Sequence, residues 1–113
     1  MTSVLYIDDD EGLARLLQKA LSRHDMIVDH ASGGAQGLVR LSEKNYDVIA
    51  LDHNLGSETG LDLIPKLVSA AGGAPIIYVT GSDDANIILS AMKAGASDYV
   101  WKDINGSYRE LIV

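Results

Sequence analysis

The stretch VLYIDDDEG, residues 4–12, sets four apolar side chains directly before four acidic ones. The run VLYI is rich in β-branched and aromatic residues, which favours a strand that is covered on both faces. Carboxylates a few ångströms apart repel one another, and the usual remedies are protonation, a basic partner or a metal ion. No Lys or Arg occurs before Arg15. Two interpretations follow: the acidic residues form a solvated turn that tolerates their charge, or they form a binding site for a positively charged group.

Four further short apolar runs follow along the chain, separated by helical patterns. These runs are MIV (26–28), DVIAL (47–51), PIIYV (75–79) and DYVW (98–101). Because they are mostly continuous rather than alternating, they indicate strands of a parallel sheet. Strand and helix then alternate five times, and right-handed crossovers give a doubly wound α/β domain with helices on both faces.

The helical segments allow several specific predictions. Ser32 is the expected N-cap of the second helix. The third helix is expected to run from Thr59, and Pro65 should kink it or end it early. Gly95 is the expected C′ residue of the fourth helix, and a fifth helix should begin around residues 105–107. The apolar stripes of the first two helices are expected to include Leu13, Leu16, Leu17, Ala20 and Leu21, then Ala35, Leu38, Val39 and Leu41.

The bulk composition restricts the class of protein. A chain of 113 residues has room for one core, so we expect a single domain. A net charge of −7 disfavours direct binding to the phosphate backbone of nucleic acids. No apolar stretch approaches the roughly 18 residues that span a bilayer, and the N-terminus lacks the basic region of a secretory signal. The absence of Cys excludes thiolate chemistry and fits a cytoplasmic setting.

Polar side chains directly follow the predicted strands at residues 4–7, 47–51, 75–79 and 98–101. They are Asp8, Asp9, Asp52, Thr80 and Lys102. Because ligands of open α/β sheets bind beyond the carboxyl ends of the strands, these side chains should converge. Carboxylates suit Mg²⁺, and a carboxylate can attack phosphorus to give an aspartyl phosphate. A cation, a hydroxyl and an ammonium group together neutralise a phosphoryl group. The pattern therefore predicts a phosphoryl-transfer site.

The motifs IDDD (7–10), LDHNLGSETG (51–60), VTG (79–81) and DYVWK (98–102), at these spacings, resemble the receiver domain of the two-component response regulator family. The resemblance covers essentially the whole chain. It implies a flavodoxin-like, CheY-like (βα)5 fold with sheet order 2-1-3-4-5, as a single domain over residues 1–113. It also implies a signalling switch that catalyses its own phosphorylation and dephosphorylation.

The same resemblance assigns roles to individual residues. Asp52 would be the phosphoacceptor, taking its phosphoryl group from a phosphohistidine on a histidine kinase or a histidine phosphotransfer protein. The implied ligands of Mg²⁺ or Mn²⁺ are Asp8, Asp9, Asp52 and the backbone carbonyl of Asn54. Thr80 and Lys102 would bind phosphoryl oxygens, and Tyr99 resembles the switch aromatic that turns inward with Thr80. Asp10 and Glu11 are instead expected at the N-terminal end of the first helix, where the helix dipole favours negative charge.

The sequence departs from the family pattern at three places. Asp103 follows Lys102 where Pro is usual, and since a non-proline cis bond costs roughly 3–4 kcal/mol, we expect a trans peptide there. Gly56 stands where Pro is common, which should loosen residues 55–59. His53, beside the acceptor, is expected to be structural or exposed rather than catalytic.

Two other functions are compatible with the same fold class. A pseudo-receiver would serve only as a protein-interaction module without phosphorylation. A flavodoxin-like cofactor carrier is disfavoured, because the loop DDDE (8–11) would repel the phosphate of FMN. The chain stops on the apolar residues LIV (111–113), so we expect a last helix that is cut short or that continues toward a fused output domain.

Overall fold

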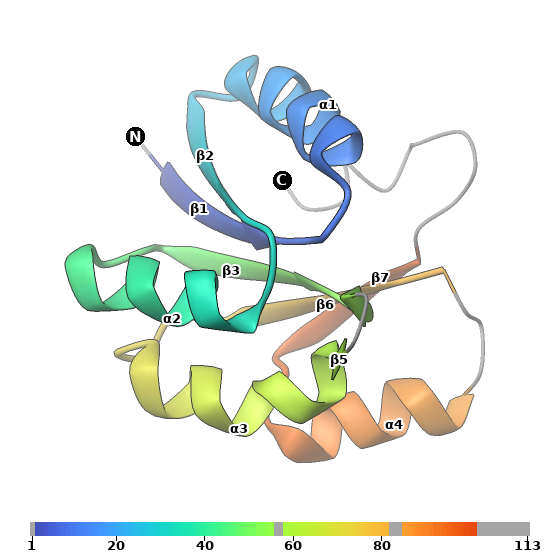
Figure 1. The fold of residues 1–113 in the computed structure, drawn as a ribbon. Coiled ribbons are helices and arrows are strands. Elements are labelled where there is room, and N and C mark those ends of the chain that lie inside the picture. The colour runs from blue at the N-terminus through green and yellow to red at the C-terminus, as the bar shows by residue number, and fades with distance from the viewer. Residues whose placement is uncertain (1, 56–57, 82–84, 102–113) are drawn as a thin grey trace.

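The computed structural model describes residues 2–55, 58–81 and 85–101 (Figure 1). Its main sheet contains five parallel strands: β1 (Thr2–Ile7), β2 (Met26–Ala31), β3 (Val48–Asp52), β6 (Ile76–Thr80) and β7 (Asp98–Trp101). Their order across the sheet is β2-β1-β3-β6-β7. When only the strands of this sheet are counted along the chain, that order is 2-1-3-4-5. The predicted doubly wound topology is therefore confirmed.

Helices cover both faces of the sheet. They are α1 (Glu11–Ser22), α2 (Gly34–Glu43), α3 (Gly60–Ala70) and α4 (Ala85–Ala94). Figure 1 shows α1 on one side of the sheet and the other three helices on the opposite side. The strands are buried from both directions, and this explains why their apolar runs are continuous.

The core consists of two apolar layers, one on each face of the sheet. In β1 the side chains alternate: Val4 and Tyr6 join the layer under α1, while Leu5 and Ile7 join the layer under the other helices. Helix α1 buries Ala14, Leu17 and Leu21 in its layer. Leu16, which the predicted stripe included, is 46% exposed. The buried stripe of α1 is therefore narrower than the stripe predicted from the spacing of its apolar residues.

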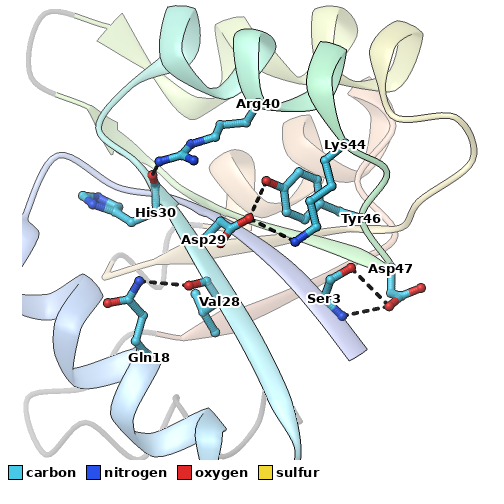
Figure 2. A network of polar contacts seen from close by, with 9 residues as sticks. All are labelled: Ser3, Gln18, Val28, Asp29, His30, Arg40, Lys44, Tyr46 and Asp47. Carbon is cyan, nitrogen blue, oxygen red and sulfur yellow. Dashed lines mark hydrogen bonds and ion pairs between the residues drawn. The ribbon is translucent and has the colours of Figure 1, made fainter. Parts of the chain in front are cut away.

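Strand β2 lies at one edge of the described sheet, and side chains cover part of its backbone. Nε2 of Gln18 donates to the carbonyl of Val28 at 2.9 Å, and Nη2 of Arg40 donates to the carbonyl of His30 at 3.3 Å (Figure 2). Exposed carbonyls on an edge strand invite pairing with another chain, and natural proteins commonly obstruct such edges. Gln18 and Arg40 obstruct this one.

The prediction that Ser32 caps the second helix is wrong. The N-cap of α2 is Gly33, which makes no side-chain cap bond. The first amide of the helix is satisfied from elsewhere, because Oε1 of Glu58 accepts a hydrogen bond from the amide of Gly34 at 2.8 Å. A carboxylate at this position also interacts favourably with the helix dipole.

The predicted buried face of α2 also needs correction, since Ala35 and Val39 are exposed. The buried residues of the helix are Gly34, Gly37 and Leu41. A Cβ atom added at Gly37 would lie 2.8 Å from Cδ1 of Ile7. The helix therefore approaches the sheet closely through glycines, which a search for apolar side chains does not detect.

Helix α3 does not end early at Pro65, contrary to one of the two expected outcomes. It begins directly after Thr59 and continues to Ala70. Proline removes one backbone donor from the helix, and the burial of Leu63 and Leu67 in the core stabilises the helix around it. The buried face outweighs the local penalty.

The end of α4 agrees with the prediction. Gly95 follows the helix with a φ of +126°, a conformation that favours glycine. Its amide donates to the carbonyl of Met92 at 3.3 Å, and the amide of Ala96 donates to the carbonyl of Ala91 at 3.0 Å. Gly95 therefore terminates α4, as predicted.

One element was not predicted. After β3 the chain forms a short antiparallel pair, β4 (Asn54–Leu55) with β5 (Glu58–Thr59). The expected fifth helix, the Lys102–Asp103 peptide and Gly56 lie outside the described residues. Among the helices that the structure describes, none is both long and apolar enough to cross a bilayer.

Candidate functional site

The sheet brings the carboxyl ends of β1, β3 and β6 together as neighbours. Ile7 pairs with Leu51, so Asp8 and Asp52 occupy equivalent positions on adjacent strands. Thr80 is the last residue of β6, the strand on the other side of β3. The topology thus places three of the predicted site residues at one edge of the sheet.

Three carboxylates form an acid cluster at this edge, made of Asp8, Asp9 and Asp52. One ligand oxygen from each lies within 4.8 Å of the others. Asp8 and Asp52 are only 1% and 4% exposed, whereas Asp9 is exposed. Carboxylates this close repel one another when ionised. A hard divalent cation prefers oxygen ligands of this kind, with water completing the coordination, so the donor set fits Mg²⁺.

Asp8 is held by contacts from two strands and from the start of α1. The hydroxyl of Tyr6 donates to its Oδ2 at 2.6 Å, and the amide of Asp10 donates to its Oδ1 at 2.9 Å. Nε2 of His30 lies 2.6 Å from the backbone carbonyl of Asp8. These contacts fix both the carboxylate and the backbone of this residue.

Asp10 and Glu11 lie at the start of α1, as predicted. Asp10 is the N-cap, and its Oδ1 accepts a hydrogen bond from the amide of Leu13 at 3.1 Å. Glu11 occupies the first turn. In the acidic run that follows β1, two residues therefore join the acid cluster and two stabilise the helix terminus.

The backbone after Asp52 is fixed by His53. Its amide donates to the carbonyl of Val79 at 2.9 Å, and its carbonyl accepts from the amide of Gly60 at 2.8 Å. Its Nδ1 hydrogen-bonds with the hydroxyl of Tyr78. Burial raises the pKa of Tyr78, so this hydroxyl keeps its proton at neutral pH. These contacts support the structural role expected for His53.

Of the remaining predicted site residues, the structure describes Thr80, Tyr99 and the backbone of Asn54. Thr80 is 1% exposed, and Tyr99 on β7 is 44% exposed. Asn54 lies in β4, two residues after Asp52. Lys102 lies outside the described residues.

Sequence reasoning missed the hydrogen bonds that support the site from Tyr6, His30 and Tyr78. A signal was available for Tyr6, because residues two apart in a strand point to the same face. A tyrosine in a buried strand also needs a partner for its hydroxyl. Asp8, two residues later, was the nearest acid on that face.

Comparison with known proteins agrees with this geometry. Residues 4–111 match the family model described as response regulator receiver domain. The chain is 33% identical over 102 residues to the response regulator ArlR of Staphylococcus haemolyticus, and equally to that of a Staphylococcus aureus strain. The match covers 90% of this chain and 46% of the relative. The chain thus spans about half the length of the curated relatives that it matches.

Solved structures with the same fold include two with ligands. A response regulator protein from Burkholderia pseudomallei, with a phosphorylated aspartic acid, calcium ion and citrate, gives a TM-score of 0.89 at 30% identity, covering 99% of this chain and 64% of that one. The response regulator TrrA from Thermotoga maritima, in complex with Mg²⁺-BeF, gives 0.83 at 27% identity, covering 99% and 96%.

Proposed function

The chain belongs to the response regulator receiver family, and from that premise we propose that it is a phosphoacceptor switch in which Asp52 receives a phosphoryl group. The observation that carries the proposal is the acid cluster, because its three carboxylates lie within 4.8 Å of one another at the carboxyl ends of β1 and β3. A buried acceptor beside two further acids is an arrangement suited to cation-assisted phosphoryl transfer.

The proposed reaction is a displacement at phosphorus. A carboxylate oxygen of Asp52 attacks the phosphorus of a phosphohistidine, so that a P–O bond forms and the P–N bond breaks. The imidazole nitrogen leaves with the electron pair of the broken bond and takes up a proton. The product on this chain is an acyl phosphate.

The charge on the phosphoryl group must be neutralised during this transfer. The proposed ligands of Mg²⁺, or of Mn²⁺, are Asp8, Asp9, Asp52 and the backbone carbonyl of Asn54; the bound cation would supply positive charge beside the phosphoryl oxygens. Thr80 and Lys102 are proposed to bind those oxygens through a hydroxyl and an ammonium group. The contacts of Tyr6 and Asp10 orient Asp8 toward this role.

The proposed partners are a histidine kinase or histidine phosphotransfer protein as donor, and an output domain or protein as receiver of the signal. Phosphorylation adds negative charge at Asp52, which would draw Thr80 toward it and shift the surface of α4, β7 and the segment after it. Exposed apolar side chains on this surface support a docking role: Leu89, Met92 and Tyr99. Tyr99 is the proposed switch aromatic. A cytoplasmic location is part of the same proposal.

The proposal predicts stoichiometric phosphorylation by a small donor. Wild type incubated with acetyl phosphate and Mg²⁺ should gain one phosphoryl group by intact-mass spectrometry, and Asp52→Ala should gain none. Asp25→Asn is the matched control, because Asp25 is an exposed acid with positive φ in the turn before β2, at the opposite end of that strand from the site.

Each result of this experiment has a clear meaning. The control variant should be phosphorylated like wild type. A folded wild type that gains no phosphoryl group from acetyl phosphate or phosphoramidate would contradict the proposal and favour the interaction-module alternative.

A further inference from the structure

Tyr6 is a polar residue in an apolar layer, and its hydroxyl reaches the acid cluster. Its side chain is 0% exposed and lies in the core layer under α1 with Leu17 and Leu21. A phenol buried in this way needs a hydrogen-bond partner. The partner is Oδ2 of Asp8 at 2.6 Å, a length typical of a strong bond between a hydroxyl and a carboxylate.

The contact of Tyr6 completes the fixation of the Asp8 carboxylate. The amide of Asp10 donates to Oδ1 at 2.9 Å, so both carboxylate oxygens are held by hydrogen bonds. A carboxylate oxygen has a second lone pair, and the group can still bind a cation while its plane is held. Asp8 is thus oriented before any cation arrives.

We infer that Tyr6 is a positioning residue for the cation site, acting through Asp8 and touching neither cation nor phosphoryl group itself. This inference rests on the proposed function, since it takes the acid cluster to be a Mg²⁺ site. Hydrogen-bond partners of metal ligands hold those ligands in place, and their loss typically weakens metal binding roughly 10–100-fold. Tyr6→Phe should therefore weaken Mg²⁺ binding roughly tenfold.

The chain contains a matched control for this substitution. The hydroxyl of Tyr46 donates to Oδ2 of Asp29 at 2.7 Å, and Tyr46 is 6% exposed (Figure 2). Tyr46→Phe thus removes the same chemical group from the same kind of bond. Asp29 does not belong to the acid cluster. Both variants should lose stability, and only Tyr6→Phe should lose Mg²⁺ affinity.

The test is isothermal titration calorimetry at constant ionic strength, in which MgCl2 is added to wild type, Tyr6→Phe and Tyr46→Phe. The expected result is a roughly tenfold higher Kd for Tyr6→Phe and an unchanged Kd for Tyr46→Phe. Equal Kd values for wild type and Tyr6→Phe would overturn the inference, as would an equal loss in both variants or a wild type that does not bind Mg²⁺.

Phosphorylation of the same samples separates this inference from the proposed function. At saturating Mg²⁺, wild type and the control Tyr46→Phe should both be phosphorylated by acetyl phosphate, because the bond of Tyr46 lies outside the acid cluster. If wild type is phosphorylated and Tyr6→Phe binds Mg²⁺ normally, the inference alone fails. If Mg²⁺ binding depends on Tyr6 and wild type is not phosphorylated, the proposed function alone fails.

A second measurement uses the unaltered protein, in case Tyr6→Phe folds poorly. Wild type labelled with ¹³C at Cζ of tyrosine reports on each hydroxyl by nuclear magnetic resonance. The Tyr6 signal should shift as MgCl2 is added, and the Tyr46 signal should stay in place. A Tyr6 signal that does not respond to bound Mg²⁺ would overturn the inference.

Discussion

Buried tyrosine hydroxyls provide several key side-chain hydrogen bonds of this molecule. Tyr6, Tyr46 and Tyr78 are each less than a tenth exposed. Each is mainly apolar and fits a core, and each hydroxyl finds a polar partner. The partners are Asp8, Asp29 and His53. Two of these bonds support the candidate site, and the third stabilises the edge of the sheet.

The bond between Tyr46 and Asp29 predicts how stability depends on pH. The hydrogen bond from Tyr46 lowers the pKa of Asp29 in the folded protein from its ordinary value of 3.8. Ionised Asp29 therefore contributes its full stabilisation of the fold above pH 3.8, and this stabilisation is lost as the pH falls through the lower pKa of the folded state. Burial raises the pKa of Tyr46 from 10.0 to about 12. Its contribution is therefore full below pH 10 and is lost as pH rises toward 12.

Tyr46→Phe should lower the free energy of unfolding by about 1.5 kcal/mol at neutral pH. It should also reduce the loss of stability at both ends of the pH range, because the bond to Asp29 and the buried hydroxyl that titrates are both absent. Urea unfolding at a series of pH values measures both effects, with Tyr99→Phe as an exposed control. A Tyr46→Phe profile parallel to that of wild type would count against this account.

The strands were predictable because burial on both faces makes their sequences continuously apolar. The runs before Asp8 and Asp52 are of this kind, and the acids that follow mark the strand ends. Parallel strands end at one edge, so the proximity of these acids could be predicted as well. The hydrogen bond of Tyr78 with His53 could not, because the two residues lie 25 positions apart and the bond depends on side-chain directions that a one-dimensional pattern does not contain.

The helices were predicted less accurately, and the reasons are local. In α2 the contact face contains Gly34 and Gly37. Because glycine has no side chain, a search for apolar periodicity does not detect this face. In α3 the effect of Pro65 was overestimated, because burial of the rest of that face stabilises the helix. The cap of α2 comes from Glu58, 24 residues away along the chain, which no local pattern reveals.

Gly60, the first residue of α3, gives an element-level prediction. A Cβ there would lie 2.5 Å from the carbonyl oxygen of Asp52 and 2.8 Å from Cε1 of Tyr78. Neither a backbone carbonyl nor a buried ring can move away easily. Gly60→Ala should therefore destabilise the fold by about 1–3 kcal/mol, as overpacked cores generally do.

Thermal or urea unfolding of Gly60→Ala and Gly12→Ala tests this. Gly12 is exposed in α1, and a Cβ there would lie 3.3 Å from only the tip of the Asp10 side chain. Alanine is also the better helix former, so Gly12→Ala should be neutral or stabilising. Equal stability for the two variants would show that the contact at Gly60 is looser than the structure indicates.

The site exists only because the whole chain folds. Asp8 and Asp52 are distant in sequence, and they become neighbours because β1 lies between β2 and β3. This is the reversal of strand order at which open α/β sheets place their ligands. A net charge of −7 adds a field that favours a cation at the acid cluster. Topology and charge thus favour the same edge of the sheet.

The position of the phosphoryl group tests this account most directly. Borohydride reduces an acyl phosphate, so a phosphorylated aspartate is converted to homoserine that tandem mass spectrometry can locate. After treatment of wild type with acetyl phosphate and Mg²⁺, we predict homoserine at position 52 alone. Homoserine at Asp8 or Asp9, or its absence from a folded and fully treated sample, would contradict the assignment of Asp52 as the acceptor.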